Sequence, residues 1–157
     1  MTINVEMKNM VKQILIVDDD EAIRITMKAI LEDEGYFVDL ASTGKEAIQK
    51  TEQKSYNIAL LDIRLPDMEG VELLGQMKDS TPRMRKIMVT GYPSVKNAIE
   101  ALNKNADAYL IKPVDIEKLL STVKDQLQQQ EDERALSELK IAEFIESRVR
   151  EISINHV

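Results

Sequence analysis

An apolar run near the middle of the chain ends on an acidic residue, and this combination constrains the fold more than any other stretch. Residues 57–61 read Asn-Ile-Ala-Leu-Leu, and they are followed by Asp62 and by a turn at Pro66-Asp67. Five residues are too few for a helix, and so short an apolar segment between polar ones is typical of a strand buried on both faces. Asp62 would then lie at the carboxyl end of that strand, where open parallel sheets bind their ligands.

Strands and helices are predicted to alternate along the rest of the chain. Four further short apolar segments predict strands at residues 13–17, 36–41, 86–90 and 108–112. Apolar residues at helical spacing predict helices at residues 23–34, 43–53, 69–79, 94–103 and 115–128. Their end signals are Gly35, a Thr43-x-x-Glu46 capping box, and the N-cap residues Ser94 and Asp115. On the helices beginning near Ser94 and Asp115, we expect Ile99 and Ile116 to face inward.

Five strands that alternate with five helices predict an α/β fold with a parallel sheet covered on both faces. The preference for right-handed crossovers leaves few ways to wind such a chain. We therefore expect a flavodoxin-like doubly wound five-stranded parallel sheet with strand order 2-1-3-4-5. Its switch point lies between the first and third strands, which end at Asp18 and Asp62, so the acidic residues converge.

The chain of 157 residues is long enough for one domain and a short appendage. We assign residues 1–12 to a flexible leader, 13–128 to the domain and 129–157 to a helical C-terminal extension. Seven polar residues at 128–134 interrupt the apolar pattern, which then resumes at Leu136, Leu139, Ala142, Ile145, Val149 and Ile152. This segment could prolong the last helix or form a separate one, and its apolar stripe could be a solvated face or the seam of a homodimer.

Composition narrows the function. The net charge is −7, and residues 112–157 hold seven basic against ten acidic residues, so we expect no direct DNA binding. No apolar run approaches the roughly 18 residues that span a membrane, and residues 1–12 do not resemble a signal peptide, so we expect a cytoplasmic protein. The absence of cysteine excludes disulfides and thiolate metal sites.

Acidic residues follow the first and third strands. Asp18, Asp19 and Asp20 are adjacent, and a pair of buried carboxylates without a cation would force one to take up a proton. A hard divalent ion such as Mg²⁺ removes that conflict, and Asp62 supplies a further ligand or a nucleophile. Taken alone, an acidic triplet is more often a solvated turn or a helix N-terminus.

Two more side chains are expected at the same edge. Thr90 and Lys112 end the fourth and fifth strands, which brings a hydroxyl and an ammonium to the acidic residues. Such a set suits phosphoryl transfer, in which catalysis consists mainly of positioning and charge neutralisation. A carboxylate nucleophile would form an acyl phosphate.

The chain resembles the receiver (CheY-like) domain of two-component response regulators over residues 13–128. The matching segments are Asp18-Asp19 after Ile-Leu-Ile-Val, Leu-Leu-Asp-Ile-Arg-Leu-Pro-Asp-Met-Glu-Gly around Asp62, Thr90-Gly91, and Tyr109-Leu110-Ile111-Lys112-Pro113. The resemblance implies that Asp62 accepts a phosphoryl group from a sensor histidine kinase or a phosphotransfer protein. It implies direct Mg²⁺ ligation by Asp19 and Asp62, water-mediated ligation by Asp18, and ligation by the backbone carbonyl of Arg64.

The resemblance also assigns roles around the phosphoryl group. Thr90 and Lys112 would bind its oxygens, and the Lys112-Pro113 peptide bond would be cis. Tyr109 matches the switch aromatic, which turns inward when Thr90 moves and so reshapes the surface that a downstream protein target reads. Arg64 and Tyr92 would tune the lifetime of the acyl phosphate.

The phosphodonor's helices would contact the first helix near Ile23 and Thr26, although Ile23 also fits an inward position. The segment from Thr90 to Val95 is similar to receivers that precede the ATPase module of enhancer-binding activators. Because the sequence stops at Val157, we expect a stand-alone receiver.

Two other functions remain open at the level of sequence. The chain could be a phosphorylation-independent interaction module that keeps the fold and uses its tail for assembly. It could also be an enzyme such as a phosphatase or a flavin protein, but it lacks an Asp-x-Asp nucleophile motif followed by Thr and a glycine- or serine-rich phosphate loop. We therefore expect a signalling domain rather than a turnover enzyme.

Overall fold

Five parallel strands form one sheet at the centre of the protein in the computed structural model, which describes residues 10–78, 80 and 82–155. The strands are β1 (Gln13–Val17), β2 (Phe37–Ala41), β3 (Ile58–Asp62), β4 (Arg85–Thr90) and β5 (Ala108–Ile111). Their order in the sheet is β2-β1-β3-β4-β5, as predicted. Every residue of β3 and β4 is buried, including Arg85, Lys86 and Thr90 at the two ends of β4.

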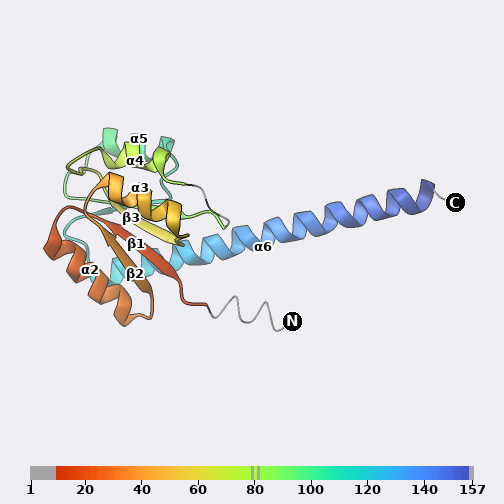
Figure 1. Ribbon diagram of the computed structural model, residues 1–157, viewed down its shortest axis with the longest axis horizontal. Helices are drawn as coiled ribbons and strands as arrows, with labels where there is room; N and C mark the ends of the chain where they lie inside the picture. The colour runs from red at the N-terminus through yellow and green to blue at the C-terminus, as the bar shows by residue number, and fades with distance from the viewer. Residues whose placement is uncertain (1–9, 79, 81, 156–157) are drawn as a thin grey trace.

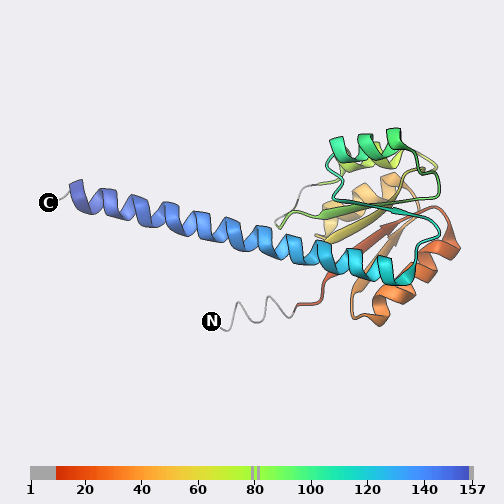
Figure 2. The ribbon, with the colours of Figure 1, turned by 180° about the vertical axis from the view of Figure 1, so that it is seen from behind.

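Helices cover both faces of the sheet. They are α2 (Glu21–Asp33), α3 (Gly44–Gln53), α4 (Gly70–Gln76), α5 (Val95–Asn103) and α6 (Ile116–Asn155). Helices α2 and α6 lie on one face, and α3, α4 and α5 lie on the other (Figures 1 and 2). Alternate residues of each strand point to opposite faces, so one core cluster contains Leu15 and Leu61 and the other contains Ile14 and Leu60.

Gly35 and Thr43 lie at helix ends as predicted, with one change in the capping box. The Asp20 side chain accepts hydrogen bonds from the first turn of α2, and Gly35 follows that helix with φ of +92°. Thr43 caps α3, but Glu46 accepts from Ser42 at 3.1 Å, one residue earlier than the capping box predicts.

Three details of the sequence-based prediction were wrong. Helix α4 ends at Gln76 and not near residue 79, because Met77 takes an extended conformation with its side chain buried. Ile99 is 51% exposed while Ala101 is fully buried, so α5 is rotated relative to the predicted apolar stripe. Ile116 is 53% exposed because it lies at the open edge of a surface groove between α2 and α6.

Helix α6 is one continuous helix of 40 residues, which answers the question that the sequence left open. The polar segment at 128–134 does not break it, because several of these side chains contact the amino ends of β3 and β4. We call the residues that make these contacts the polar clamp: Asn57, Arg85, Gln126, Gln129, Gln130 and Glu133.

Two residues dominate the polar clamp. Gln130 is 3% exposed; its amide nitrogen donates to the backbone oxygens of Asn57 and Arg83 at 3.0 and 2.8 Å, and its amide oxygen accepts from the Asn57 side chain at 3.0 Å. The Arg85 guanidinium donates to Gln126, Gln129 and Glu133 at 2.9 to 3.0 Å. These bonds extend the attachment of α6 past the apolar core.

Beyond the polar clamp, α6 projects from the domain as a single rod (Figures 1 and 2). From residue 135 to 155 every residue is exposed. No described helix is long and apolar enough to cross a membrane. The predicted leader at 1–12 lies mostly outside the described residues.

Candidate functional site

The acidic triplet after β1 divides into residues of two kinds. Asp20 is the N-cap of α2, and its side chain accepts from the N–H groups of Ala22 and Ile23 at 2.9 and 3.2 Å. Asp18 is 3% exposed, and one of its carboxylate oxygens accepts from the Asp20 N–H at 2.9 Å. Asp19 lies between them and is exposed. The local turn therefore directs Asp18 toward the carboxyl edge of the sheet and leaves Asp19 accessible.

Asp62 meets these acids from the neighbouring strand, because β1 and β3 are adjacent and in parallel register. Asp62 is 6% exposed. One carboxylate oxygen from each of Asp18, Asp19 and Asp62 lies within 4.8 Å of the others. The topology thus gathers the three acids that the sequence predicted as metal ligands.

Lys112 supplies the counter-charge. It follows β5, and its ammonium lies 2.6 Å from Asp18 Oδ2 and 3.3 Å from Asp62 Oδ2. Burial opposes the charged form of Lys112, but the hydrogen bond and the charge of Asp18 outweigh it, so the pKa of Lys112 is raised. The next peptide bond, Lys112-Pro113, is cis.

Burial and neighbouring charges have opposing effects on the pKa of the Asp62 carboxyl. Burial raises its pKa, the Lys112 charge lowers it, and the negative charge of Asp18 raises it again, with a net increase. One ammonium thus serves two buried carboxylates, with a third carboxylate beside them. This donor set of hard oxygens, with one exposed member and excess negative charge, fits Mg²⁺.

Thr90 ends β4 beside Asp62 and is fully buried. The strands pair so that Val89 is opposite Asp62, which puts Thr90 one residue further toward the edge. Its hydroxyl oxygen accepts from the backbone N–H of Tyr92 at 3.0 Å. Thr90 is therefore held by the loop that follows its own strand.

Tyr109 lies on β5 beside β4, where Met88 is its partner in the register. Its ring packs against the core cluster that includes Met77, Met84 and Ala101. Burial raises the pKa of the Tyr109 phenol, while the backbone of Ser94 partly offsets that increase. The ring thus occupies an inward position next to the strand that carries Thr90.

Arg64 connects the loops after β3 and β4. Its guanidinium stacks on the Tyr92 ring, 4.2 Å from the ring centroid, and its backbone N–H lies 3.5 Å from Asp62 Oδ1. Both residues are exposed. The pair therefore links the loops that follow two neighbouring strands.

Two residues that support the site were not recognised from the sequence. A Cβ atom on Gly70 would overlap the backbone oxygen of Asp62 and lie only 3.0 Å from Ile63 Cα, so only glycine allows α4 to begin against the acidic strand end. Asp67 accepts from the N–H groups of Gly44 and Lys45 at 2.9 Å and so ties the loop after β3 to the start of α3. Their signal is the Pro-Asp turn followed three residues later by glycine.

The strand order and the acidic edge define a doubly wound α/β domain with an acidic pocket at the switch point of the sheet. The profile of the response regulator receiver domain matches residues 14–124. The chain therefore belongs to the receiver domain family of response regulators, whose members are signalling domains.

Curated relatives share the domain but are much longer. Transcriptional regulatory protein ZraR of Klebsiella oxytoca is 40% identical over 114 residues, which are 73% of this chain and 26% of that protein. Alginate biosynthesis transcriptional regulatory protein AlgB of Pseudomonas aeruginosa is 36% identical over 116 residues, with 74% and 26% covered. The chain thus spans about a quarter of the length of these curated relatives.

Solved structures support the same assignment. A CheY-like receiver domain protein from Methanospirillum hungatei is 52% identical, with a TM-score of 0.76 and coverage of 79% of this chain and 99% of that one. The beryllofluoride-activated NtrC4 receiver domain dimer is 37% identical, with a TM-score of 0.72 and coverage of 76% and 99%.

Proposed function

We propose that this protein is a phosphoacceptor in a two-component phosphorelay and that Asp62 is the residue phosphorylated. The observation that carries the proposal is the Lys112 ammonium, which bonds to both Asp18 and Asp62 at an edge that also holds Asp19. A phosphoryl group that arrives at Asp62 would find the Lys112 ammonium within contact distance of its oxygens. It would also find Asp18 and Asp19, which can bind a divalent cation. The donor is a phosphohistidine of a sensor histidine kinase or of a phosphotransfer protein.

In the reaction, a carboxylate oxygen of Asp62 attacks phosphorus. A P–O bond forms while the P–N bond to the donor imidazole breaks, and the imidazole takes up a proton as it leaves. Lys112 then exchanges its contact with the Asp62 carboxylate for a phosphoryl oxygen, and the Thr90 hydroxyl donates to another. Hydrolysis of the acyl phosphate by water restores the Asp62 carboxylate and releases phosphate.

Asp18, Asp19, Asp62 and the backbone carbonyl of Arg64 are the groups that would hold Mg²⁺. When bound, the ion supplies neutralisation of the charge on the acids and on the phosphoryl oxygens. Asp19 is the accessible member of the set, so its removal leaves the buried Asp18–Lys112–Asp62 contacts in place. Asp19 is thus the residue at which cation binding is best tested separately from folding.

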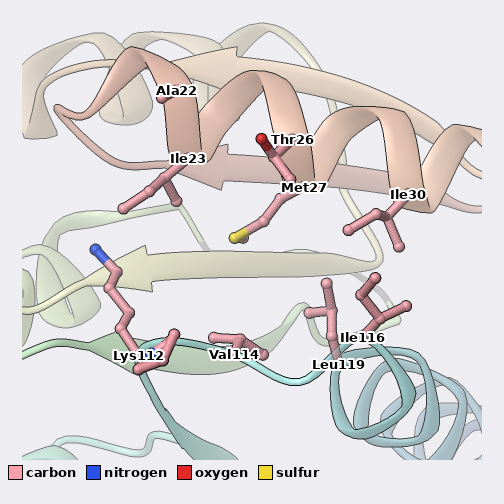
Figure 3. A pocket seen from close by; sticks show the side chains of 10 residues that line it. Ala22, Ile23, Thr26, Met27, Ile30, Lys112, Val114, Ile116 and Leu119 are labelled. Carbon is pink, nitrogen blue, oxygen red and sulfur yellow. The ribbon is translucent and has the colours of Figure 1, made fainter.

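An apolar groove beside the site supports docking of the phosphodonor (Figure 3). Its volume is about 640 Å³, and its lining comes from α2, from the segment that joins β5 to α6 and from the first turn of α6. The lining residues are Ala22, Ile23, Thr26, Met27, Ile30, Lys112, Pro113, Val114, Ile116 and Leu119. Because Lys112 lies at one end of the groove, a donor helix that covers it would bring a phosphohistidine close to Asp62.

Phosphorylation is proposed to act on Thr90 and Tyr109. The Thr90 hydroxyl can donate to the phosphoryl group while its oxygen still accepts from the Tyr92 N–H, so a shift of Thr90 toward the phosphoryl group moves the loop after β4 with it. The inward ring of Tyr109 packs behind that strand, so its position depends on Thr90. The phosphoryl group changes the populations of the arrangements before and after this movement only to the extent that it stabilises one of them more than the other.

A labelling experiment tests the proposal. The purified protein is incubated with Mg²⁺ and acetyl phosphate, which releases acetate as it transfers its phosphoryl group, and the intact mass is measured. We expect one phosphoryl group on the wild type, none on Asp62→Asn, and strongly reduced labelling of Asp19→Asn. Labelling that persists in Asp62→Asn would contradict the assignment.

The second candidate is a receiver-like interaction module that works without phosphorylation. The observation that favours it is the long exposed segment of α6, which presents a binding surface irrespective of Asp62. An unlabelled wild type, under conditions that label a control receiver, would favour this candidate.

A further inference from the structure

Half of the large apolar side chains that are strongly exposed in the described part of the chain lie on the distal segment of α6. They are Leu136, Leu139, Ile141, Phe144, Ile145, Val149, Ile152 and Ile154, each 52 to 74% exposed. Exposed apolar groups gathered on one element mark an interaction surface. Among the described residues, the segment projects away from the rest of the domain as a rod (Figures 1 and 2).

A subset of these residues forms one seam. At 100° per residue, Ala142, Ile145, Val149 and Ile152 lie within an arc of about 80°, and their spacing alternates between three and four. Such a spacing is the a and d pattern of a helix that packs against another helix. Ile141 borders the seam, whereas Phe144 lies to one side of it.

The charged residues beside the seam indicate what kind of helix would pack against it. Residues 136–155 contain three basic and four acidic side chains, mixed along the helix. Membrane-surface helices need a polar face rich in Lys and Arg, which this segment lacks. The ion pairs Arg148–Glu151 and Arg150–Glu146 lie within the helix and already match these charges. A near-neutral, internally paired surface suits a partner with the same composition.

We propose that the distal segment of α6 pairs with the same segment of a second copy of this chain, as a parallel, in-register two-helix coiled coil over residues 141–152. The inference goes beyond the phosphoacceptor function and does not depend on the chemistry of Asp62.

Repulsion between like charges decides the relative direction of the two helices. In the parallel arrangement, Arg148 of one copy lies beside Ser153 of the other, and Ile141 lies beside Glu146. An antiparallel pair with full overlap of the seam brings Arg148 beside its own counterpart and Glu146 beside its own counterpart. Like charges that face each other destabilise a helix pair, so the parallel arrangement is favoured.

Glu138 marks the amino-terminal end of the seam. It falls one heptad before Ile145, where a parallel pair would bring two carboxylates together, and it is instead bonded to Arg134 of its own helix. The paired region is therefore short. The area that it buries is smaller than the roughly 800 Å² per partner of stable complexes, so we expect a weak dimer, with a dissociation constant on the order of 10 µM.

Sedimentation of the full chain tests the pairing. We expect the wild type to change from monomer to dimer as its concentration rises to roughly 300 µM, well above the dissociation constant expected of so small an interface. Ile145→Glu should remain monomeric. Phe144→Glu is the matched control, because its exposure is similar, at 59% against 55%, and the added charge is the same. Far-UV circular dichroism of both variants checks that α6 is retained.

Cysteine cross-linking tests the direction, and the natural chain contains no cysteine. Ala142→Cys should form a disulfide between copies under mild oxidation, because residues 142 face each other only in the parallel pair. Ser147→Cys, on the opposite side of the helix, should cross-link much less. Equal sedimentation of Ile145→Glu and Phe144→Glu, a wild type that stays monomeric at the highest concentration, or equal cross-linking at 142 and 147 would each overturn the proposal.

Discussion

Replacing Gln130 with alanine should strongly destabilise the domain, although the residue is polar and lies in a segment of high polarity. The side chain is 3% exposed and makes three hydrogen bonds to the amino ends of β3 and β4. Each such bond contributes about 0.5–1.5 kcal/mol net, and a buried group left unpaired costs more. We therefore expect the free energy of unfolding to fall by about 2–4 kcal/mol.

Gln128→Ala is the matched control. Gln128 is exposed on the same helix and makes one hydrogen bond, to Asp132 at 2.9 Å, so its replacement should cost at most about 0.5 kcal/mol. Urea unfolding followed by circular dichroism measures both variants. With a slope of about 1.5 kcal/mol per M, the midpoint of Gln130→Ala should fall by roughly 1–3 M. Equal midpoints for the two variants would refute the structural role of the polar clamp.

Two further perturbations follow from contacts near and far from the site. Gly70→Ala should destabilise the protein by about 1–3 kcal/mol and slow phosphoryl labelling of Asp62, because the added Cβ overlaps the Asp62 backbone; Gly75→Ala on the same helix has open space and should be neutral or slightly stabilising. A normally labelled, fully stable Gly70→Ala would contradict this account. Tyr56→Phe tests a pH dependence: burial alone would raise the pKa of Asp39, but the 2.6 Å bond from the Tyr56 hydroxyl helps to lower it, so the bond stabilises the fold near neutral pH. Its contribution begins to decline as the pH falls below about 4 and is lost only as the pH passes below the lowered pKa of folded Asp39. Urea unfolding of wild type and Tyr56→Phe should show a difference of about 1–2 kcal/mol at pH 7 and a smaller difference at pH 3.5.

The strands and the site were predictable because their signals are local. Each strand contains a short stretch of apolar residues, and side chains at the carboxyl ends of neighbouring parallel strands must meet at one edge of the sheet. Asp18, Asp62 and Lys112 could therefore be grouped before any coordinate was known, and they do lie together.

The helix faces were less predictable, because helical spacing alone does not say which way an element rotates. Ile99 and Ile116 fit apolar stripes, yet both are more than half exposed. Arg85 and Gln130 are buried, although no local pattern predicts the burial of such polar residues. Their burial depends on partners that lie more than 40 residues away in the chain.

The sequence by itself determined the order of the elements, the parallel sheet and the acidic residues at its carboxyl edge. The spacing of apolar residues and the points at which strands end can be recognised from neighbouring residues in the chain. Only the tertiary structure decided that Asp20 caps α2 while Asp18 binds Lys112, that Gly70 is required by the approach of α4 to β3, and that α6 runs unbroken past its polar segment. These outcomes depend on distances between segments far apart in the chain, and no local pattern encodes such distances.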